Sequence, residues 1–467
     1  MGMEDLHELL ARFERAGRLL RVTEPVDPRF ELPGVCTRLH RDPALRQHVA
    51  LFEHVQGHRM PVVGNLCDTR EKVAFALGCE PNELLARGVR AVEQPIPPVV
   101  VAGGPCQDVS IDPPDLRQLP LCTNSELDGG PYVNTGLHIT RNPSTGVRNV
   151  GVQRNMYHAP DLLGIYMAPT HMFQHYLQTA AQDKPLPVAI AVGVHPALMV
   201  ASQMRIAFDE DEMAAAGGLV GGPVELVRCR TVPLEVPAHS EVVIEGEVLP
   251  HERRREGPFG EFARLYGAVR DLPVIRVTAI THRRDAIWWN MIAATIPENA
   301  VIGAVGREPA LYKAVRGAVP TVTAVHMPVG AGANFHAIIA LKKSMEGEPQ
   351  KAAFAAFAHQ DLIKHVFVVD DDIDVYDPTD VEYALATRFQ ADRDIYTIPR
   401  VKGNPLDPAA DEYATGRATV TKMIVDATKP LGASPDHYRF AEVPRDVMAR
   451  IEENWLRYVG TPAAARR

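Results

Sequence analysis

The chain has 467 residues, of which 46% are hydrophobic and 23% charged, which is typical of a globular protein with several domains. Its formal net charge of −9 argues against binding of the whole chain to nucleic-acid phosphates. The longest apolar run, 187–201, is too short and too interrupted to cross a membrane. The sequence shows no CxxC pair and no signal peptide, and this favours a cytoplasmic protein with reduced thiols.

The first segment, residues 1–115, alternates helical and strand patterns, which predicts a small N-terminal α/β domain. Apolar residues recur on one face of a predicted helix over residues 3–16. The elements predicted after it are strands at 49–53 and 61–65 and helices at 70–76 and around 84–85.

The second segment, residues 116–308, contains many short β-rich runs separated by turn residues, which predicts a barrel or sandwich. Two helices are expected to interrupt it, near 170–181 and 209–216. The predicted strands are 136–141, 148–154, 186–194, 223–232, 241–248, 274–282 and 286–291.

The third segment, residues 309–440, alternates helix and strand again, which favours a C-terminal α/β domain. Its predicted elements are helices at 309–318 and 350–357 and strands at 322–328, 335–342 and 366–369. In the last segment, 441–467, an amphipathic helix at 446–458 presents Val447, Ile451, Trp455 and Tyr458. Such a terminal helix packs on a core or on a partner chain.

Two carboxylates flank a Gly-Pro turn in the sequence Glu-Gly-Pro-Phe-Gly-Glu, residues 256–261. Because the turn folds the chain back, Glu256 and Glu261 can approach one small volume. When two acids share a site, one is shifted towards its protonated form, which is the form that a proton-donating step requires. The alternative is an ordinary acidic hairpin.

An arginine ends the β-rich sequence Asn-Val-Gly-Val-Gln-Arg, residues 149–154. Strand alternation places Asn149, Gly151 and Gln153 on one face, and Arg154 on the other. Since a buried arginine without an anion is costly, we expect a partner, either Glu256 or a substrate carboxylate. The alternative is a surface arginine on an edge strand.

Two acidic runs are candidates for cation sites. The run 209–212 precedes a helix, where acids either cap the helix or bind a hard cation such as Mg²⁺ or Mn²⁺. Asp370, Asp371, Asp372 and Asp374 follow a predicted buried strand, and they form either a metal site or a solvated junction.

Several motifs together resemble the signature stretches of the UbiD decarboxylases. They occur in the family's order and spacing, and they are the stretches 149–154, 219–227, 236–241, 256–261, 364–374 and 421–428. The resemblance implies an N-terminal α/β domain, a central split β-barrel like that of flavin reductases, and a C-terminal α/β domain. It also implies that the terminal helix supports oligomerisation, as a homodimer or a higher homo-oligomer.

The resemblance also implies a set of site residues. Arg154, Glu256 and Glu261 would form the catalytic network, with Glu261 as the acid/base nearest the scissile carboxylate. The remaining roles concern prenylated FMN, a divalent metal (Mn²⁺ or Mg²⁺) and K⁺. They fall on Asn149, His171 and Glu212 for the divalent metal, on Ala201, Ser202, Met204 and Glu212 for K⁺, and on Asn149, Arg154, Thr135, Thr170, His171, Ser202, Met204 and Lys364 for the cofactor.

Some assignments within this set have alternatives. His175 competes with His171 as the metal ligand, because the loop after Asn149 differs in length by one residue from the family pattern. The carbonyl of Val147, where some members carry Trp, is a further candidate ligand for K⁺. Arg264 either pairs with a second carboxylate or phenolate of the substrate or is a surface residue.

The activity implied is reversible, non-oxidative decarboxylation of an aromatic, heteroaromatic or α,β-unsaturated carboxylic acid, with a flavin prenyltransferase supplying the cofactor. Trp288, Trp289 and the stretch 293–303 would shape an aromatic pocket or belong to the core. Two other classes stay open: a flavin-binding split-barrel protein without decarboxylase activity, and a metal-dependent hydrolase that uses the Asp370 cluster.

Overall fold

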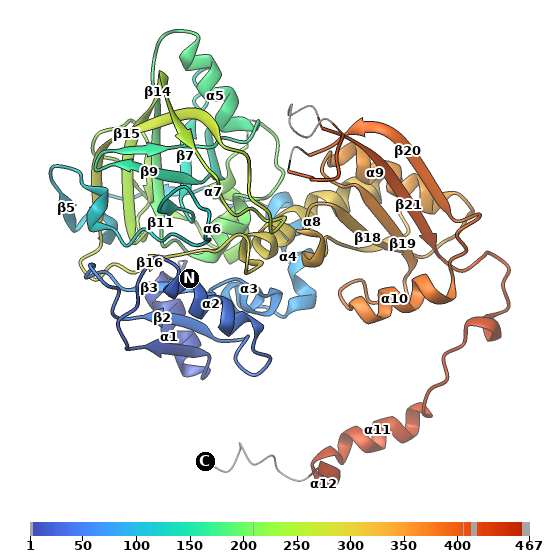
Figure 1. Cartoon of the computed structure of the whole chain (residues 1–467). Coiled ribbons are helices and arrows are strands. Elements are labelled where there is room, and N and C mark those ends of the chain that lie inside the picture. Colours follow the sequence, from blue (N-terminus) through green and yellow to red (C-terminus); the bar gives the residue numbers. More distant parts are fainter. Residues whose placement is uncertain (1–2, 209, 405, 412–417, 460–467) are drawn as a thin grey trace.

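A computed structural model describes residues 3–208, 210–404, 406–411 and 418–459 of the chain. Figure 1 shows an N-terminal body (blue), a central body rich in strands (green and yellow), a C-terminal body (orange) and a terminal arm (red). Asp209, which begins the acidic run 209–212, and the end of the predicted terminal segment, 460–467, lie outside the described residues.

The N-terminal body contains a sheet in the order β1-β2-β3-β16, covered by helices. Helix α1 begins at a capping box, in which Asp5 accepts a hydrogen bond from the Glu8 backbone and Glu8 accepts one from the Asp5 backbone. The elements are α1 (Leu6–Arg15), β1 (Leu19–Val22), α2 (Glu31–Arg41), β2 (Val49–Phe52), β3 (Val62–Gly64), α3 (Arg70–Leu77) and α4 (Leu84–Glu93).

Strand β16 (Trp288–Trp289) corrects the prediction that 286–291 is a barrel strand. It lies parallel to β3 at the edge of the N-terminal sheet, and the Trp288 N–H donates to the Pro61 carbonyl at 2.8 Å. Both tryptophans are fully buried. An apolar strand that buries both faces therefore joins the central segment to the first sheet.

The central body is a curled antiparallel half-barrel sheet, in the order β6-β9-β10-β15-β14-β11-β7-β8, with β5 beside β15. Its longest strands, β14 and β15, pair as far as Glu256 opposite Arg270. The strands are β5 (Val109–Ile111), β6 (Tyr132–Val133), β7 (Leu137–Arg141), β8 (Arg148–Val152), β9 (Asn155–Ala159), β10 (Leu162–Gly164), β11 (Leu186–Val192), β14 (Val242–Glu256) and β15 (Arg270–His282).

Short helices and a small separate sheet accompany the half-barrel. The predicted barrel strand 223–232 lies instead in that small sheet, where β12 pairs with β13 and β4. The elements are β4 (Val99–Val100), α5 (His171–Ala180), α6 (Pro196–Ala201), α7 (Glu212–Val220), β12 (Glu225–Arg228) and β13 (Glu235–Pro237).

Helix α8 (Glu298–Ala318) leads into the C-terminal body and begins eleven residues before the predicted start at residue 309. Pro309 lies inside it, where the missing N–H costs one helical hydrogen bond. Gly88 of α4 packs closely against the proline ring, since a β-carbon there would lie 2.4 Å from Pro309 Cγ. The ring therefore lies in the contact between α4 and α8, where only glycine leaves room for it.

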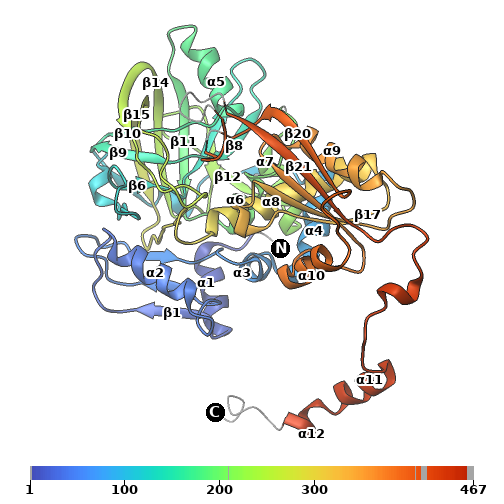
Figure 2. The same ribbon diagram turned by 45° about the vertical axis from the view of Figure 1, so that its right-hand side comes forward.

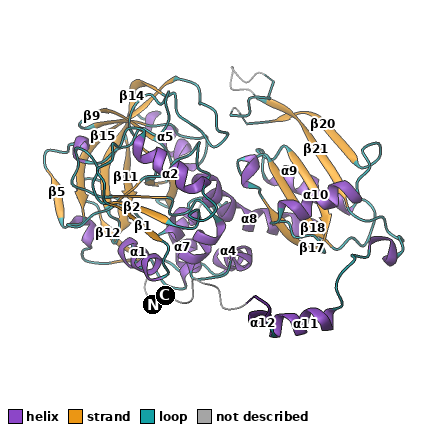
Figure 3. Ribbon diagram, turned by 60° about the horizontal axis from the view of Figure 1, so that its bottom comes forward, coloured by secondary structure: helices purple, strands orange, loops and turns teal. Residues whose placement is uncertain are grey.

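The C-terminal body has a mixed sheet in the order β17-β18-β19-β21-β20, with α9 and α10 beside it (Figure 3). Strands β18, β19 and β21 are parallel, as the alternation of helix and strand predicts. The elements are β17 (Val322–His326), β18 (His336–Leu341), α9 (Glu348–His359), β19 (His365–Asp370), α10 (Pro378–Thr387), β20 (Ile395–Lys402) and β21 (Thr419–Ala427).

The terminal arm carries α11 (Arg445–Glu453) and α12 (Trp455–Val459), and Figures 1 and 2 agree that it extends away from the three bodies. One helix over 446–458 is predicted, but the chain breaks it at Asn454. Trp455 is 52% exposed and Tyr458 65% exposed. Among all the described helices, none combines the length and apolarity needed to cross a membrane.

Candidate active site

Arg154 lies between the two glutamates of the Gly-Pro turn. Its Nε donates to Glu256 Oε1 at 2.8 Å and its Nη2 donates to Glu256 Oε2 at 2.9 Å. Its Nη1 donates to Glu261 Oε1. The expectation that this arginine has an anionic partner in Glu256 is confirmed. One guanidinium therefore binds two carboxylates: both oxygens of Glu256 and one oxygen of Glu261.

The loop after β14 brings Glu261 back to the arginine. Gly257 has a φ of +91°, a backbone region that glycine adopts without strain. The chain then folds into a narrow hairpin, in which the Glu261 N–H donates to the Leu265 carbonyl at 2.9 Å. Gly267 closes it, and a β-carbon there would lie 3.2 Å from Glu261 Oε1. The absence of a side chain at Gly267 thus leaves room for the carboxylate.

Aromatic rings surround the guanidinium. Its central carbon lies 4.5 Å from the centre of the Tyr166 ring and 4.9 Å from that of Phe259, within the range of cation–π attraction. The Tyr132 hydroxyl donates to Glu256 Oε1 at 3.3 Å, and burial, followed by the charge of Glu256, raises the pKa of that tyrosine. Glu256 is completely buried, so its position is fixed by these partners.

A cavity of about 480 Å³ opens beside this network, between the half-barrel and the C-terminal body. Arg154 and Glu261 line it from the central body, whereas Leu362 and Asn404 line it from the C-terminal body. Glu261 therefore faces a space of the size that proteins use for small-molecule ligands. The arrangement can hold a carboxylate-bearing ligand and exchange a proton with it.

Two of the predicted metal ligands, Asn149 and Glu212, lie side by side. Glu212 Oε2 accepts the Val150 N–H at 2.8 Å, which places this carboxylate beside Asn149. Burial raises the pKa of Glu212 to about 8. His171 and its competitor His175 both contact Phe208, with ring centres 4.8 Å and 5.7 Å from it.

These residues fit a hard divalent cation. A buried carboxylate needs a counter-charge, and oxygen ligands with one imidazole suit Mn²⁺ or Mg²⁺. His175 Nδ1 is hydrogen-bonded to Thr140 at 3.0 Å, and its Nε2 is buried without a hydrogen-bond partner. Within the described part of the chain, no three or more His, Cys, Asp or Glu side chains form a metal-binding group. The predicted divalent-metal ligands do not form such a group because one of the three, Asn149, is an asparagine.

Three of the predicted K⁺ ligands, Ala201, Ser202 and Met204, lie at or just after the end of α6, where helix carbonyls lack partners within the helix. The fourth, Glu212, begins α7. The Ala201 carbonyl accepts the Met204 N–H at 3.0 Å, and the Ser202 hydroxyl donates to Met199 O at 2.7 Å. The Val147 carbonyl accepts the Asn142 N–H at 2.8 Å. Each carbonyl oxygen has a second lone pair that a cation can use.

The structure separates other residues of the predicted set. Of the predicted cofactor residues, Arg154 and Thr170 line the cavity. The others are absent from its described lining: Asn149, Thr135, His171, Ser202, Met204 and Lys364. The Thr135 hydroxyl donates to the Trp289 carbonyl, and Lys364 forms an ion pair with Asp407 at 2.9 Å. Arg264 is exposed.

The acidic cluster after β19 has a structural role. The Arg388 guanidinium contacts Asp370 and Asp372, each at 2.7 Å. Asp372 also binds Lys429 at 2.5 Å. Because cations of the chain itself occupy these oxygens, the cluster is not arranged as the metal site of a hydrolase.

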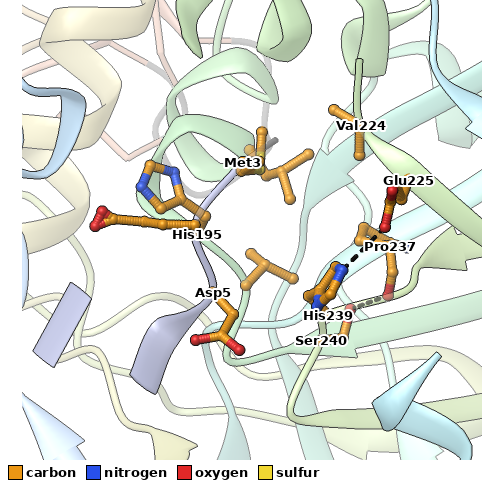
Figure 4. Close-up of a pocket in the computed structure, with 11 residues that line it drawn as sticks. Met3, Asp5, His195, Val224, Glu225, Pro237, His239 and Ser240 are labelled. Carbon is orange, nitrogen blue, oxygen red and sulfur yellow. Dashed lines mark hydrogen bonds and ion pairs between the residues drawn. The ribbon is translucent and has the colours of Figure 1, made fainter. Parts of the chain in front are cut away.

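Sequence reasoning missed the polar side chains that line the rest of the cavity. No motif marks them, because each lies in an ordinary helix or loop pattern; among them are Gln203, Arg205, Arg307, Asn334, Asp361 and Lys402. Asn299 also lines the cavity, within the stretch 293–303 that is one of the expected pocket segments. A separate small pocket of about 20 Å³ lies near the N-terminus, where His239 bonds Glu225 at 3.1 Å (Figure 4). It has room for about one water molecule and is not a substrate site.

Three family models cover most of the chain. They are described as the N-terminal domain, the Rift-related domain and the C-terminal domain of 3-octaprenyl-4-hydroxybenzoate carboxy-lyase, and they match residues 10–92, 99–296 and 300–427. An anhydromevalonate phosphate decarboxylase from Methanothermobacter thermautotrophicus is 37% identical over 420 residues, covering 90% of this chain and 96% of the relative.

Solved structures agree with these matches. The UbiD-class enzyme HmfF from Pelotomaculum thermopropionicum, in complex with FMN, is 39% identical, with a TM-score of 0.89 over 96% of this chain and 100% of that one. An apo 3,4-dihydroxybenzoic acid decarboxylase from Enterobacter cloacae is 31% identical, with a TM-score of 0.87 over 96% of this chain and 99% of that one. The chain therefore belongs to the UbiD family.

Proposed function

We propose that this protein is a decarboxylase that removes CO2, reversibly and without oxidation, from an aromatic, heteroaromatic or α,β-unsaturated carboxylic acid by means of prenylated FMN. The observation that carries the proposal is Arg154 held between Glu256 and Glu261, with Glu261 facing a cavity of about 480 Å³. A relative named as a 3,4-dihydroxybenzoic acid decarboxylase and a UbiD-class enzyme solved with FMN support it.

The prenylated flavin, when bound, supplies the electron sink that loss of CO2 from an unsaturated carbon requires. The chain supplies the acid–base chemistry. Glu261 holds a proton at the cavity and delivers it to the carbon that carried the carboxyl group. Arg154 neutralises one of the two carboxylates and orients both, while the buried Glu256 fixes the guanidinium plane. Such a proton transfer contributes about 10²–10⁴-fold in rate.

We further propose that a divalent cation, Mn²⁺ or Mg²⁺, binds Asn149, His171 or His175, and Glu212. K⁺ would bind Glu212 and the carbonyls of Ala201, Ser202 and Met204. The buried Glu212 supports this, because a cation beside it removes the cost of its ionisation. A Glu212→Gln protein is expected to contain less than a tenth of the wild-type manganese when purified from manganese-supplemented cells, measured by elemental analysis. Unchanged manganese content would contradict the assignment.

For the cofactor, the proposed contacts are Asn149, Arg154, Thr170, His171, Ser202 and Met204. Lys364 would reach a cofactor phosphate only after its ion pair with Asp407 opens. Thr135 supports the site through the Trp289 carbonyl. We also propose that the half-barrel is a split barrel of the flavin-reductase type, with domains at 1–115, 116–308, 309–440 and 441–467.

Co-expression with a flavin prenyltransferase, followed by measurement of CO2 release from a panel of unsaturated acids, tests the function. Wild-type protein is expected to show a modified-flavin absorbance and to release CO2 from at least one acid. Glu261→Gln is expected to keep the absorbance and lose turnover, because the amide cannot donate the proton.

Glu247→Gln is the matched control, since Glu247 lies on β14 in a surface ion pair with Arg276. It is expected to behave as wild type. Near-normal decarboxylation by Glu261→Gln would refute the role of Glu261, and absence of CO2 release from every acid would refute the function.

A further inference from the structure

Two arginines line the cavity without a carboxylate to balance them. Arg205 follows α6 and Arg307 lies in α8, and both belong to the cavity lining. Within the described residues, neither guanidinium forms an ion pair, and the only hydrogen bond of Arg307 goes from Nη2 to the Ala333 carbonyl at 3.2 Å. The pair contrasts with Arg154, which lines the same cavity and is matched by Glu256 and Glu261.

The environment of Arg307 makes its lack of a partner costly. Its Nε is buried without a hydrogen-bond partner. Burial, together with the nearby charge of Arg205, lowers the pKa of Arg307 to about 10, so the side chain is still cationic at neutral pH. Much of the Arg205 side chain is exposed, yet the surrounding protein also lowers its pKa. Arg307 is therefore a buried positive charge with a second positive charge nearby, and this raises the free energy of the folded state.

Neighbouring groups do not remove this excess charge. Asp361 is the acid whose charge acts on Arg205, but its carboxylate already binds Lys402 at 2.5 Å. Two amide side chains, Asn299 and Asn334, also line the cavity, but their unpaired buried atoms are Oδ1 acceptors, which cannot donate to an anion. The chemistry of an anion site comes from the two guanidinium groups, whose N–H donors are not taken up by any carboxylate among the described residues.

The local sequence of α8 places the arginine head at the cavity. Gly303 lies one turn before Arg307, and a β-carbon on it would be 2.3 Å from Arg307 Nη2. The guanidinium therefore lies across its own helix, over the glycine. Any larger residue at position 303 would displace it.

We infer that Arg205 and Arg307 form an anion subsite that binds a second negatively charged group of the substrate, distinct from the carboxylate that is lost. This inference rests on the proposed decarboxylase function. The substrate is then a dianionic acid whose second group is a carboxylate or a phosphate ester, held at one end while the other end meets Glu261. The phosphate of the flavin is the competing source of the anion, and the experiment separates the two.

The experiment is a calorimetric titration of FMN-loaded protein with two acids of the same skeleton, cinnamate and 4-carboxycinnamate. Wild-type protein is expected to bind the dianion about tenfold or more tightly than the monoanion, because the second carboxylate accepts charged hydrogen bonds from the guanidinium groups. A factor of ten in affinity corresponds to about 1.4 kcal/mol of binding free energy. Arg307→Met and Arg205→Met are each expected to lose this preference while keeping the affinity for cinnamate. Arg307→Lys is expected to retain part of it.

The matched control is Arg316→Met, which removes an exposed arginine from the same helix and is expected to keep the wild-type preference. The FMN content of each variant, read from its absorbance, distinguishes the source of the anion. Loss of FMN from Arg307→Met and Arg205→Met would assign the site to the flavin phosphate and overturn the inference.

Equal binding of both acids by wild-type protein, or binding of neither, would also overturn it. Failure of the proposed function is recognised separately. It appears as absence of CO2 release by protein loaded with prenylated FMN, whereas the titration needs no turnover.

Discussion

Arg70 of α3 and Glu308 of α8 form a buried ion pair, with Arg70 Nη1 2.8 Å from Glu308 Oε2, that joins the N-terminal body to the helix carrying Arg307. Glu308 also accepts hydrogen bonds from the His326 ring at 2.8 Å and from the Met327 backbone at 3.0 Å. Burial alone would raise the pKa of Glu308, but Arg70 and His326 hold it below its ordinary value. One carboxylate thus connects three parts of the chain.

Substitution Glu308→Gln is expected to lower the free energy of unfolding by about 3–5 kcal/mol, because it leaves the buried Arg70 charge without a partner. Urea unfolding followed by circular dichroism measures the change. Arg38→Ala, which breaks an exposed ion pair with Asp42, serves as control and is expected to change stability by less than about 1 kcal/mol. Equal stability of Glu308→Gln and wild type would show that the pair does not hold the bodies together.

The second prediction concerns the pH dependence of stability and Glu298, at the start of α8. Burial, followed by the charge of Asp68, raises the pKa of Glu298 to about 8. The folded state therefore holds a proton that the unfolded state loses near pH 4.5. The contribution of Glu298 to stability is largest below about pH 4.5 and falls as pH rises towards about 8, by on the order of 1 kcal/mol per pH unit.

Glu298→Gln is expected to remove this slope. The amide oxygen can still accept the Cys67 N–H, which lies 2.8 Å from Glu298 Oε1. Urea midpoints at pH 5, 6.5 and 8 should show the variant gaining on wild type as pH increases. A constant difference between the two proteins across this range would contradict the assigned pKa.

Gly267→Ala tests how tightly the position of Glu261 is set. The added methyl group would lie 3.2 Å from Glu261 Oε1, so the carboxylate must move by a few tenths of an ångström. We expect kcat to fall about tenfold or more, with cofactor content unchanged, since small displacements of catalytic groups are costly. Steady-state kinetics with the best acid of the panel measures it.

The matched control for this substitution is Gly317→Ala, where no heavy atom lies within 4 Å of the added carbon. It should leave kcat unaltered. If Gly267→Ala also retained full kcat, the carboxylate would not need the position that the structure gives it.

Removal of the arm after Pro444 is the fourth prediction. The arm leaves Trp455, Leu456 and Tyr458 exposed, and apolar surface of this kind is stabilised by a partner chain. We expect the full chain to form a homodimer or higher homo-oligomer, and the truncated chain to be monomeric, by light scattering coupled to gel filtration. A full-length monomer, or an unchanged mass after truncation, would exclude this role.

Local patterns were sufficient for many elements. Apolar periodicity predicts α1 and β2, and the Gly-Pro turn predicts that Glu256 and Glu261 approach each other, as they do. The pairing of Arg154 with Glu256 follows from the cost of burying an arginine alone. These features depend on interactions that the nearby sequence already encodes.

Other features depend on contacts between distant segments. Strand β14 continues to Glu256 because β15 pairs with it, although the charged residues 252–255 have the pattern of a loop. Helix α8 continues through Pro309, whose ring packs against Gly88 of the distant helix α4. Arg307 belongs to the cavity only because α6, α8 and the C-terminal body meet there. No single-sequence pattern carries this information.

The placement of the tryptophans gives the protein two separable optical signals. The chain has three tryptophans. Trp288 and Trp289 of β16 are fully buried, whereas Trp455 on the arm is half exposed to solvent. Iodide should therefore quench only the emission of Trp455. This quenching should decrease when a partner chain covers the arm. The colour and quenching of the native fluorescence can thus follow the arm and the folded interior independently, without any label.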